Sequence, residues 1–229
     1  MQPKSPVPTI TWIGLLLALF GVPLVILIIT RTAPEGPLTN LFVVERELSV
    51  FAVTGVLLLL IVKGEKLGLD SIGLYFHDWG KSILWGLLGV LIVGAALAIV
   101  FLFFHLAGIS FGQGSEIGRY RNVSLWTFTF MVLRAGIVEE FCYRGYVIER
   151  LEKITGNWVV YLLIPLFLFA AFHYKQGVGG MIIAFVAGGI LAGLYLKRRD
   201  LKANMITHFL VDFIPNVLIP ALSALFGGK

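Results

Sequence analysis

The sequence predicts an all-α, polytopic transmembrane bundle of seven or eight helices, forming one integral-membrane domain over residues 1–229. Of these residues, 58% are hydrophobic and only 14% are charged, whereas soluble domains carry about 25% charged residues. Apolar stretches of about 17–25 residues recur along the chain, and helices of that length cross a hydrocarbon core of about 30 Å. Polar, glycine-containing connections separate these stretches.

The predicted membrane helices follow the apolar runs in chain order. They cover residues 10–29, 41–62, 82–104, 125–154, 158–172, 178–196 and a last run that begins near Leu201. Gly156 is expected to end the fourth helix, because glycine commonly closes helices. Pro215 and Pro220 either kink the last run or separate a short eighth helix over residues 216–226. The charged residues 45–47 are expected to place the first turns of the second helix at the membrane interface.

The charges in the connections predict an orientation. With helices alternating in direction, ten lysines and arginines fall on one side and four on the other. The positive-inside rule then places the N-terminus in the cytoplasm. The same rule accounts for the net charge of +5, so nucleic acid is not an expected partner. The ten residues are Lys4, Lys63, Lys66, Lys81, Arg150, Lys153, Lys197, Arg198, Arg199 and Lys202, and the four are Arg31, Arg119, Arg121 and Lys175.

Three charged side chains lie deep in the fourth apolar run, namely Glu139, Glu140 and Arg144. Each costs about 2.5–3.5 kcal/mol at the bilayer centre on the mildest scale, so these residues need partners, water or a function. Glu140 and Arg144 are four residues apart and share a helix face, which predicts an ion pair. Glu139 points about 100° away, and its i+4 residue is Tyr143. We therefore interpret Glu139 as the reactive carboxylate, with a purely structural ion network as the alternative.

Two later helices carry histidines. His173 ends the fifth helix one turn after Phe169, and His208 and Asp212 lie one turn apart on the seventh helix. Because residues four apart share a helix face, His208 and Asp212 point the same way. Together with the glutamate pair, these side chains predict one polar site inside the bundle.

These residue types leave three chemistries open. His173, His208 and Glu139 could ligate Zn²⁺, because two imidazoles and a carboxylate form a zinc ligand set with an open position. Without a metal, Glu139 and His173 could deprotonate a water that attacks an amide, while His208, oriented by Asp212, stabilises the oxyanion. Both routes lead to peptide-bond hydrolysis. The third chemistry is proton or cation relay.

Three motifs resemble the type II CAAX prenyl endopeptidase family, also called CPBP (CAAX proteases and bacteriocin-processing enzymes) or Abi. EExxxRG corresponds to residues 139–145, FxxxH to residues 169–173 and HxxxD to residues 208–212, in the family's order. The resemblance covers residues 125–218, which we interpret as the catalytic core. Asparagine is commoner at the position of Asp212. Ionised aspartate cannot donate a hydrogen bond, so Asp212 is expected to hold His208 or to bind a metal.

The resemblance implies an intramembrane endopeptidase, with Glu139 and His173 activating water, Glu140 pairing with Arg144, and His208 acting on the oxyanion. Both a metalloprotease and a metal-free mechanism are associated with the family. The expected partners are the lipid bilayer and a peptide or protein substrate, either C-terminally prenylated or bacteriocin-like. The expected location is the plasma membrane of a prokaryote. The alternatives are a non-enzymatic immunity or regulatory protein on the same scaffold and an ion-coupled transporter.

Overall fold

All regular elements that the structure describes are helices. The structure is a computed structural model, and it describes residues 7–33, 35–108 and 117–226. The predicted all-α class is confirmed over these residues. Lys4, which contributes to the predicted orientation, lies outside the described residues.

Several of the helical rods contain π-helical turns between their α-helical parts. The N-terminal elements are α1 (Thr9–Leu16), η1 (Leu17–Gly21), α2 (Val22–Thr30), α3 (Asn40–Leu59), η2 (Leu60–Gly64), η3 (Leu69–Ile72), α4 (Trp79–Leu106) and η4 (Ile117–Tyr120). They are followed by α5 (Leu125–Glu139), η5 (Glu140–Ile148), α6 (Glu149–Thr155), η6 (Val159–Leu163), α7 (Ile164–Ala171), η7 (Tyr174–Gln176), α8 (Gly177–Arg198), α9 (Leu201–Phe213), η8 (Ile214–Leu218) and α10 (Ile219–Phe226).

Within the described part of the chain, five helices are long and apolar enough to cross a membrane. They are Thr9–Thr30, Asn40–Gly64, Trp79–Leu106, Tyr174–Arg198 and Leu201–Phe226. The rod Leu125–Thr155 carries the charged motif, and the apolar helix Val159–Ala171 is shorter than a full span. The number of seven or eight membrane helices therefore stays a prediction. The last helix is continuous, because Pro215 is accommodated in the π-helical turn η8.

Local sequence signals explain where three of the helices begin and where one ends. The side chains of Thr39, Ser124 and Asp200 accept hydrogen bonds from backbone N–H groups in the first turns of α3, α5 and α9. Such caps satisfy donors that have no partner within the helix. Gly156 ends α6 with a φ of 62°, as predicted, because glycine adopts this left-handed conformation without strain.

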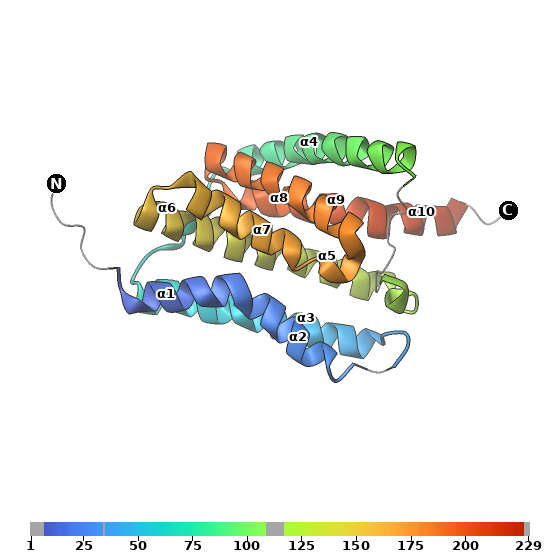
Figure 1. Cartoon of the computed structure of the whole chain (residues 1–229), viewed down its shortest axis with the longest axis horizontal. Coiled ribbons are helices and arrows are strands. Elements are labelled where there is room, and N and C mark those ends of the chain that lie inside the picture. The colour runs from blue at the N-terminus through green and yellow to red at the C-terminus, as the bar shows by residue number, and fades with distance from the viewer. Residues whose placement is uncertain (1–6, 34, 109–116, 227–229) are drawn as a thin grey trace.

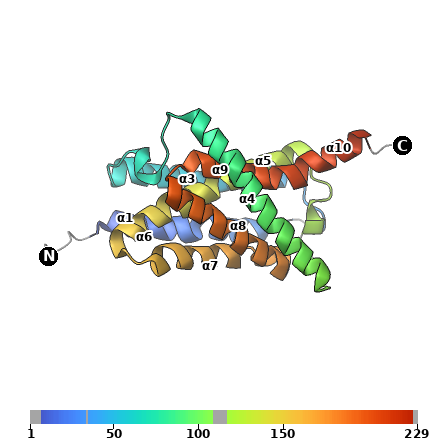
Figure 2. The same cartoon turned by 90° about the horizontal axis from the view of Figure 1, so that it is seen from above.

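The rod Leu125–Thr155 lies in the middle of the bundle. Its α5 part packs between α3 and α9, and its η5 part contacts η1, α7 and α9. The rod formed by α1 and α2 runs along α3 on one flank, and α4 packs on α9 and α8 on the other (Figure 1). Figure 2 shows that α4 crosses the other helices obliquely. The helix that carries the EExxxRG motif is thus the most enclosed one.

The hydrophobic core is centred on this enclosed helix. All nine residues of η5 are buried, and they pack with apolar side chains such as Leu57 of α3 and Leu201 of α9. In contrast, α4 exposes large apolar side chains such as Leu91 and Ile99. A helix that faces lipid presents such a surface, because hydrocarbon offers no partner to polar groups.

The basic connections gather at one end of the bundle. Arg150 donates to Glu65 across 2.7 Å, and Arg199 donates to Glu149 across 2.7 Å. These contacts join residues 63–81, 149–156 and 197–202, which we call the basic end. Which face of the membrane the basic end occupies stays a prediction.

Candidate active site

The EExxxRG motif lies where the central helix changes its geometry. α5 ends at Glu139, and Glu140 begins η5, a π-helical stretch that continues to Ile148. π-Helical turns are rare in proteins and frequently occur at functional sites. The two adjacent glutamates lie at this change of geometry, and their side chains enter different hydrogen-bond networks.

Glu140 is the centre of the first network. Its side chain has no exposed area, and its Oε1 lies 2.8 Å from Nη1 of Arg144 and 2.8 Å from Nδ1 of His208. Nδ2 of Asn204 donates to Oε2 across 3.1 Å. A fully buried carboxylate requires such partners, because an uncompensated charge would cost several kcal/mol. The ion pair between Glu140 and Arg144 that the spacing predicts is present.

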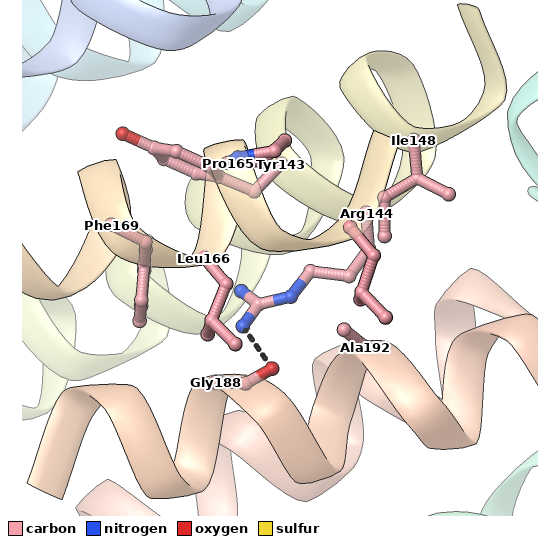
Figure 3. A pocket seen from close by; sticks show the side chains of 9 residues that line it. Tyr143, Arg144, Ile148, Pro165, Leu166, Phe169, Gly188 and Ala192 are labelled. Carbon is pink, nitrogen blue, oxygen red and sulfur yellow. Dashed lines mark hydrogen bonds between the residues drawn. The ribbon is translucent and has the colours of Figure 1, made fainter. Parts of the chain in front are cut away.

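Arg144 connects this network to the FxxxH helix and to α8. Its Nη2 donates to the carbonyl oxygen of Gly188 across 3.0 Å, and its guanidinium lies 4.6 Å from the ring centroid of Phe169 (Figure 3). A Cβ atom at position 188 would lie only 3.1 Å from Nη2, so glycine permits this close approach. The guanidinium borders a cavity of about 10 Å³, roughly room for one water molecule.

His208 lies between two carboxylates. Its Nδ1 bonds to Glu140, and its Nε2 lies 3.5 Å from Oδ2 of Asp212. A carboxylate that is ionised can only accept, so Nδ1 carries a hydrogen and Nε2 is the nitrogen left for a ligand. The side chain of Asp212 is 36% exposed, whereas that of His208 is 10% exposed. The His208–Asp212 pair therefore faces outward from the closed part of the network.

His173 follows the end of α7, and its own helix fixes its orientation. Its Nδ1 lies 2.7 Å from the carbonyl oxygen of Phe169, and the two rings are 4.7 Å apart. Because a carbonyl can only accept, Nδ1 is the donor, and Nε2 of the neutral ring is free to accept a proton. Phe169 thus supports two motifs, since its ring contacts Arg144 and its carbonyl orients His173.

Glu139 belongs to a second buried network. Arg134 donates from Nη1 to Oε1 of Glu139 across 2.9 Å, and its Nε also pairs with Glu47. Glu47 pairs in turn with Arg46. Arg134, Glu47 and Arg46 are all buried, while the side chain of Glu139 is 14% exposed. Oε2 of Glu139 has no hydrogen-bond partner among the described residues.

This network corrects one expectation from the sequence. Glu139 is not without a partner, because the long side chain of Arg134 reaches it across five residues of the same helix. Arg46 and Glu47 are buried against α5, and the position of the first turns of α3 at the membrane interface stays a prediction.

The predicted site residues are brought together only in part. Glu140, Arg144, His208 and Asp212 form one connected network. Within the described residues, neither Glu139 nor His173 is hydrogen-bonded to that network or to the other.

Sequence reasoning also missed several participants, although some carried a signal. Asn204 lies four residues before His208 and eight before Asp212, so it shares their helix face. Arg134 is a further cation in the same apolar helix as the glutamate pair. No local signal identifies Glu47, which is 87 residues away from Arg134.

The donor atoms do not form a zinc site in this arrangement. Nδ1 of His208 is engaged by Glu140 and Nδ1 of His173 by the Phe169 carbonyl, so Nε2 is the nitrogen of each ring that could bind a metal. Over the described ranges, no group of three or more histidine, cysteine, aspartate or glutamate side chains is placed to hold a metal ion. Cys142 is buried in the core. Direct measurement of the metal content decides the zinc alternative.

Comparison with known proteins identifies the family of this segment. Residues 121–214 match the family model described as "Type II CAAX prenyl endopeptidase Rce1-like". A search of curated proteins and a search of solved structures each found no match. The matched segment contains all three motifs and the network around Glu140, whereas Arg46 and Glu47 of the second network lie outside it. The segment formed by residues 121–214 is therefore assigned to the family of type II CAAX prenyl endopeptidases described as Rce1-like.

Proposed function

We propose that this protein is an intramembrane endopeptidase in which Glu139 activates the attacking water. The observation that carries the proposal is the different environment of the two adjacent glutamates. Glu140 is fully buried, whereas Glu139 is partly exposed, and its Oε2 has no hydrogen-bond partner in the described part of the chain. A general base needs an accessible lone pair within hydrogen-bond reach of water. Of the two, only Glu139 meets this requirement.

The proposed reaction starts from an ionised Glu139, held by Arg134. Its free oxygen takes a proton from a water, whose oxygen adds to the carbonyl carbon of the scissile peptide bond. The protonated Glu139 then gives the proton to the leaving nitrogen as the C–N bond breaks. His173 assists by accepting a hydrogen bond from the water at Nε2, which the bond to the Phe169 carbonyl leaves free.

His208 is proposed to stabilise the oxyanion that forms in this reaction. Its ring is held through Nδ1 by Glu140, which Arg144 and Asn204 fix in place. In the imidazolium form both ring nitrogens carry a hydrogen, so in this form Nε2 donates a hydrogen bond to the negatively charged oxygen. Asp212 lies beside Nε2 and holds the imidazole from the other side. A donor fixed in advance stabilises the transition state without reorganisation.

The proposed substrate is a peptide or protein close to the membrane, either C-terminally prenylated or bacteriocin-like. We propose that the protein lies in the plasma membrane of a prokaryote and that its basic end faces the cytoplasm. This orientation would place the N-terminus in the cytoplasm. Residues such as Arg150, Arg199 and Lys202 support this, because cytoplasmic connections are enriched in positive charge.

The test compares the wild-type protein with the Glu139→Gln variant in phosphatidylcholine vesicles. The probes are a farnesylated reporter peptide ending in a CAAX sequence, its unmodified form and a bacteriocin-like precursor peptide, with cleavage followed by mass spectrometry. Loss of the base should slow cleavage by about 10²–10⁴-fold. Glu45→Gln, which removes an exposed carboxylate from α3, is the matched control and should leave the rate unchanged.

Two results would contradict the proposal. If Glu139→Gln cleaved a probe at the wild-type rate, Glu139 would not be the base. If no probe were cleaved while Glu139→Gln retained the protein's biological activity, the non-enzymatic alternative would be favoured.

A further inference from the structure

A second polar site lies at the basic end, between the beginning of α4 and the turn from α8 to α9. It is a cavity of about 160 Å³ lined by side chains from residues 75–82 and 198–202, and we call it the basic pocket. Three of the five candidate membrane spans have an end here, namely Trp79–Leu106, Tyr174–Arg198 and Leu201–Phe226. α4 packs against both α8 and α9 (Figures 1 and 2). The basic pocket therefore lies at the depth where these helices leave the hydrocarbon.

Lys202 is the buried cation of the basic pocket. Only 3% of the residue is exposed, and its ammonium donates to the carbonyl oxygen of His77 and lies 4.6 Å from the ring centroid of Trp79. Both partners are electrically neutral. Among the described residues, no carboxylate lies within ion-pair distance of Lys202. A buried charge without an opposite charge is costly, so an anionic ligand would stabilise this ammonium.

Two further cations face the basic pocket. The guanidinium of Arg198 lies 4.6 Å from the ring centroid of Trp85, and no carboxylate in the described part of the chain pairs with it. Lys81 reaches Asp78 only at 3.5 Å, and both side chains are more than half exposed. An ion pair of this kind contributes at most about 1 kcal/mol, so Lys81 can turn to another anion.

The pocket has a second carboxylate besides Asp78, and this one already accepts two hydrogen bonds within the protein. Oδ2 of Asp200 accepts a hydrogen bond from Ser82 Oγ across 2.7 Å, and Oδ1 accepts from the backbone N–H of Ala203 across 3.2 Å. Asp200 thus serves as the N-cap of α9 and joins it to α4. With three cations against two carboxylates, the lining carries a net charge of +1.

We propose that the basic pocket binds the phosphate of an anionic phospholipid head group. Lysine and arginine side chains bind phosphate well, and basic pockets between membrane helices are suited to acidic lipid head groups. A lipid is favoured over free phosphate because tryptophans typical of the membrane interface, Trp79 and Trp85, flank the cations. This site is separate from the proposed protease chemistry, and its test does not depend on cleavage.

The test measures the thermal unfolding midpoint of the full chain in a neutral detergent with added phosphatidylglycerol, phosphatidylcholine or inorganic phosphate. The pocket variant Lys81→Gln/Arg198→Gln removes two exposed cations from the pocket. The matched control Lys153→Gln/Lys197→Gln removes two exposed cations from the basic end outside it. Phosphatidylglycerol should raise the midpoint of the wild-type protein and of the control. The phosphatidylglycerol concentration needed for half of this effect should rise roughly thirtyfold in the pocket variant.

Three results would overturn the proposal. The first is an equal response of the pocket variant and the control, because the effect would then reflect general surface charge. The second is an equal midpoint shift with phosphatidylcholine. The third is a full shift with inorganic phosphate alone, which would assign the pocket to free phosphate. If the pocket variant proves unstable without lipid, the single variants Lys81→Gln and Arg198→Gln give the same comparison.

Discussion

Arg134 donates from Nη1 to Oε1 of Glu139 across 2.9 Å, so the carboxylate that we assign to water activation is half of a buried ion pair. The pair extends through Glu47 to Arg46 on α3. This chain of alternating charges fixes one oxygen of Glu139, and the other has no hydrogen-bond partner among the described residues. The position of the base therefore depends on α3, a helix outside the segment matched by the family model.

We expect Arg134→Gln to lower both stability and activity. The change leaves the buried Glu47 with one cation and Glu139 with none, and breaking a buried ion pair costs about 3–5 kcal/mol. Cleavage rate and thermal midpoint in detergent are the two measurements. Arg134→Lys keeps the charge and should retain more stability than Arg134→Gln. A pH–rate profile of Arg134→Gln that matches the wild-type profile would argue against control of Glu139 by this residue.

The two glutamates should differ in their contribution to stability. Glu140→Gln leaves the buried Arg144 without its carboxylate and deprives His208 of an ionised acceptor, so we expect a loss of about 3–5 kcal/mol. Glu139→Gln should cost less, because Arg134 keeps Glu47 as a partner. Chemical unfolding of both variants in the same detergent tests this order. Equal losses would contradict the assignment of Glu140 to the closed network.

Asp212→Asn is expected to keep activity within a few fold of the wild type. Asparagine can donate a hydrogen bond to the oxyanion, whereas ionised aspartate can only accept. Asp212→Ala removes the group beside Nε2 of His208, and we expect a rate loss of about 10²-fold. Because the side chain is 36% exposed, both variants should unfold near the wild-type temperature. A larger loss in Asp212→Asn than in Asp212→Ala would contradict the proposed role.

The stability of the basic end should decrease in acid because of Glu65. This residue lies just outside the span Asn40–Gly64. Burial opposes its charge, but hydrogen bonds from Arg150, Thr11 and Tyr146 outweigh this and hold the pKa of the carboxyl below its ordinary value of 4.5. Such a group stabilises the fold above the unfolded pKa, and the contribution is lost as the pH falls through the lower, folded pKa.

The thermal midpoint should therefore fall as the pH is lowered below 4.5, and Glu65→Gln should reduce this dependence. Glu35→Gln, at an exposed position on another connection, serves as the control and should leave the pH dependence unchanged. A Glu65→Gln profile parallel to that of the wild type would refute the prediction.

We expect cleavage to continue in the presence of a chelator, because His173, His208 and Glu139 are not placed as a ligand triad. Metal content is measured by mass spectrometry on purified wild-type protein and on His173→Ala/His208→Ala. About one zinc per chain in the wild type, lost in the double variant together with chelator-sensitive activity, would establish the zinc alternative instead.

Much of this molecule could be predicted from local spacing. The pairs Glu140–Arg144 and His208–Asp212 follow from the rule that residues four apart share a helix face, and both are close in the structure. The lengths of the apolar runs indicated the helices, and Gly156 ended α6 where expected. These features depend only on helix geometry, which is the same whatever the helix packs against.

Only the tertiary structure decided which of the two glutamates stays accessible. Glu140 meets His208 from 68 residues away, and Arg134 meets Glu47 from 87 residues away. The sequence by itself determined that buried charges of both signs exist and therefore need partners. It could not determine the pairing, because a charge buried in hydrocarbon is stabilised by whichever opposite charge the packing brings near, and that depends on how separate helices cross.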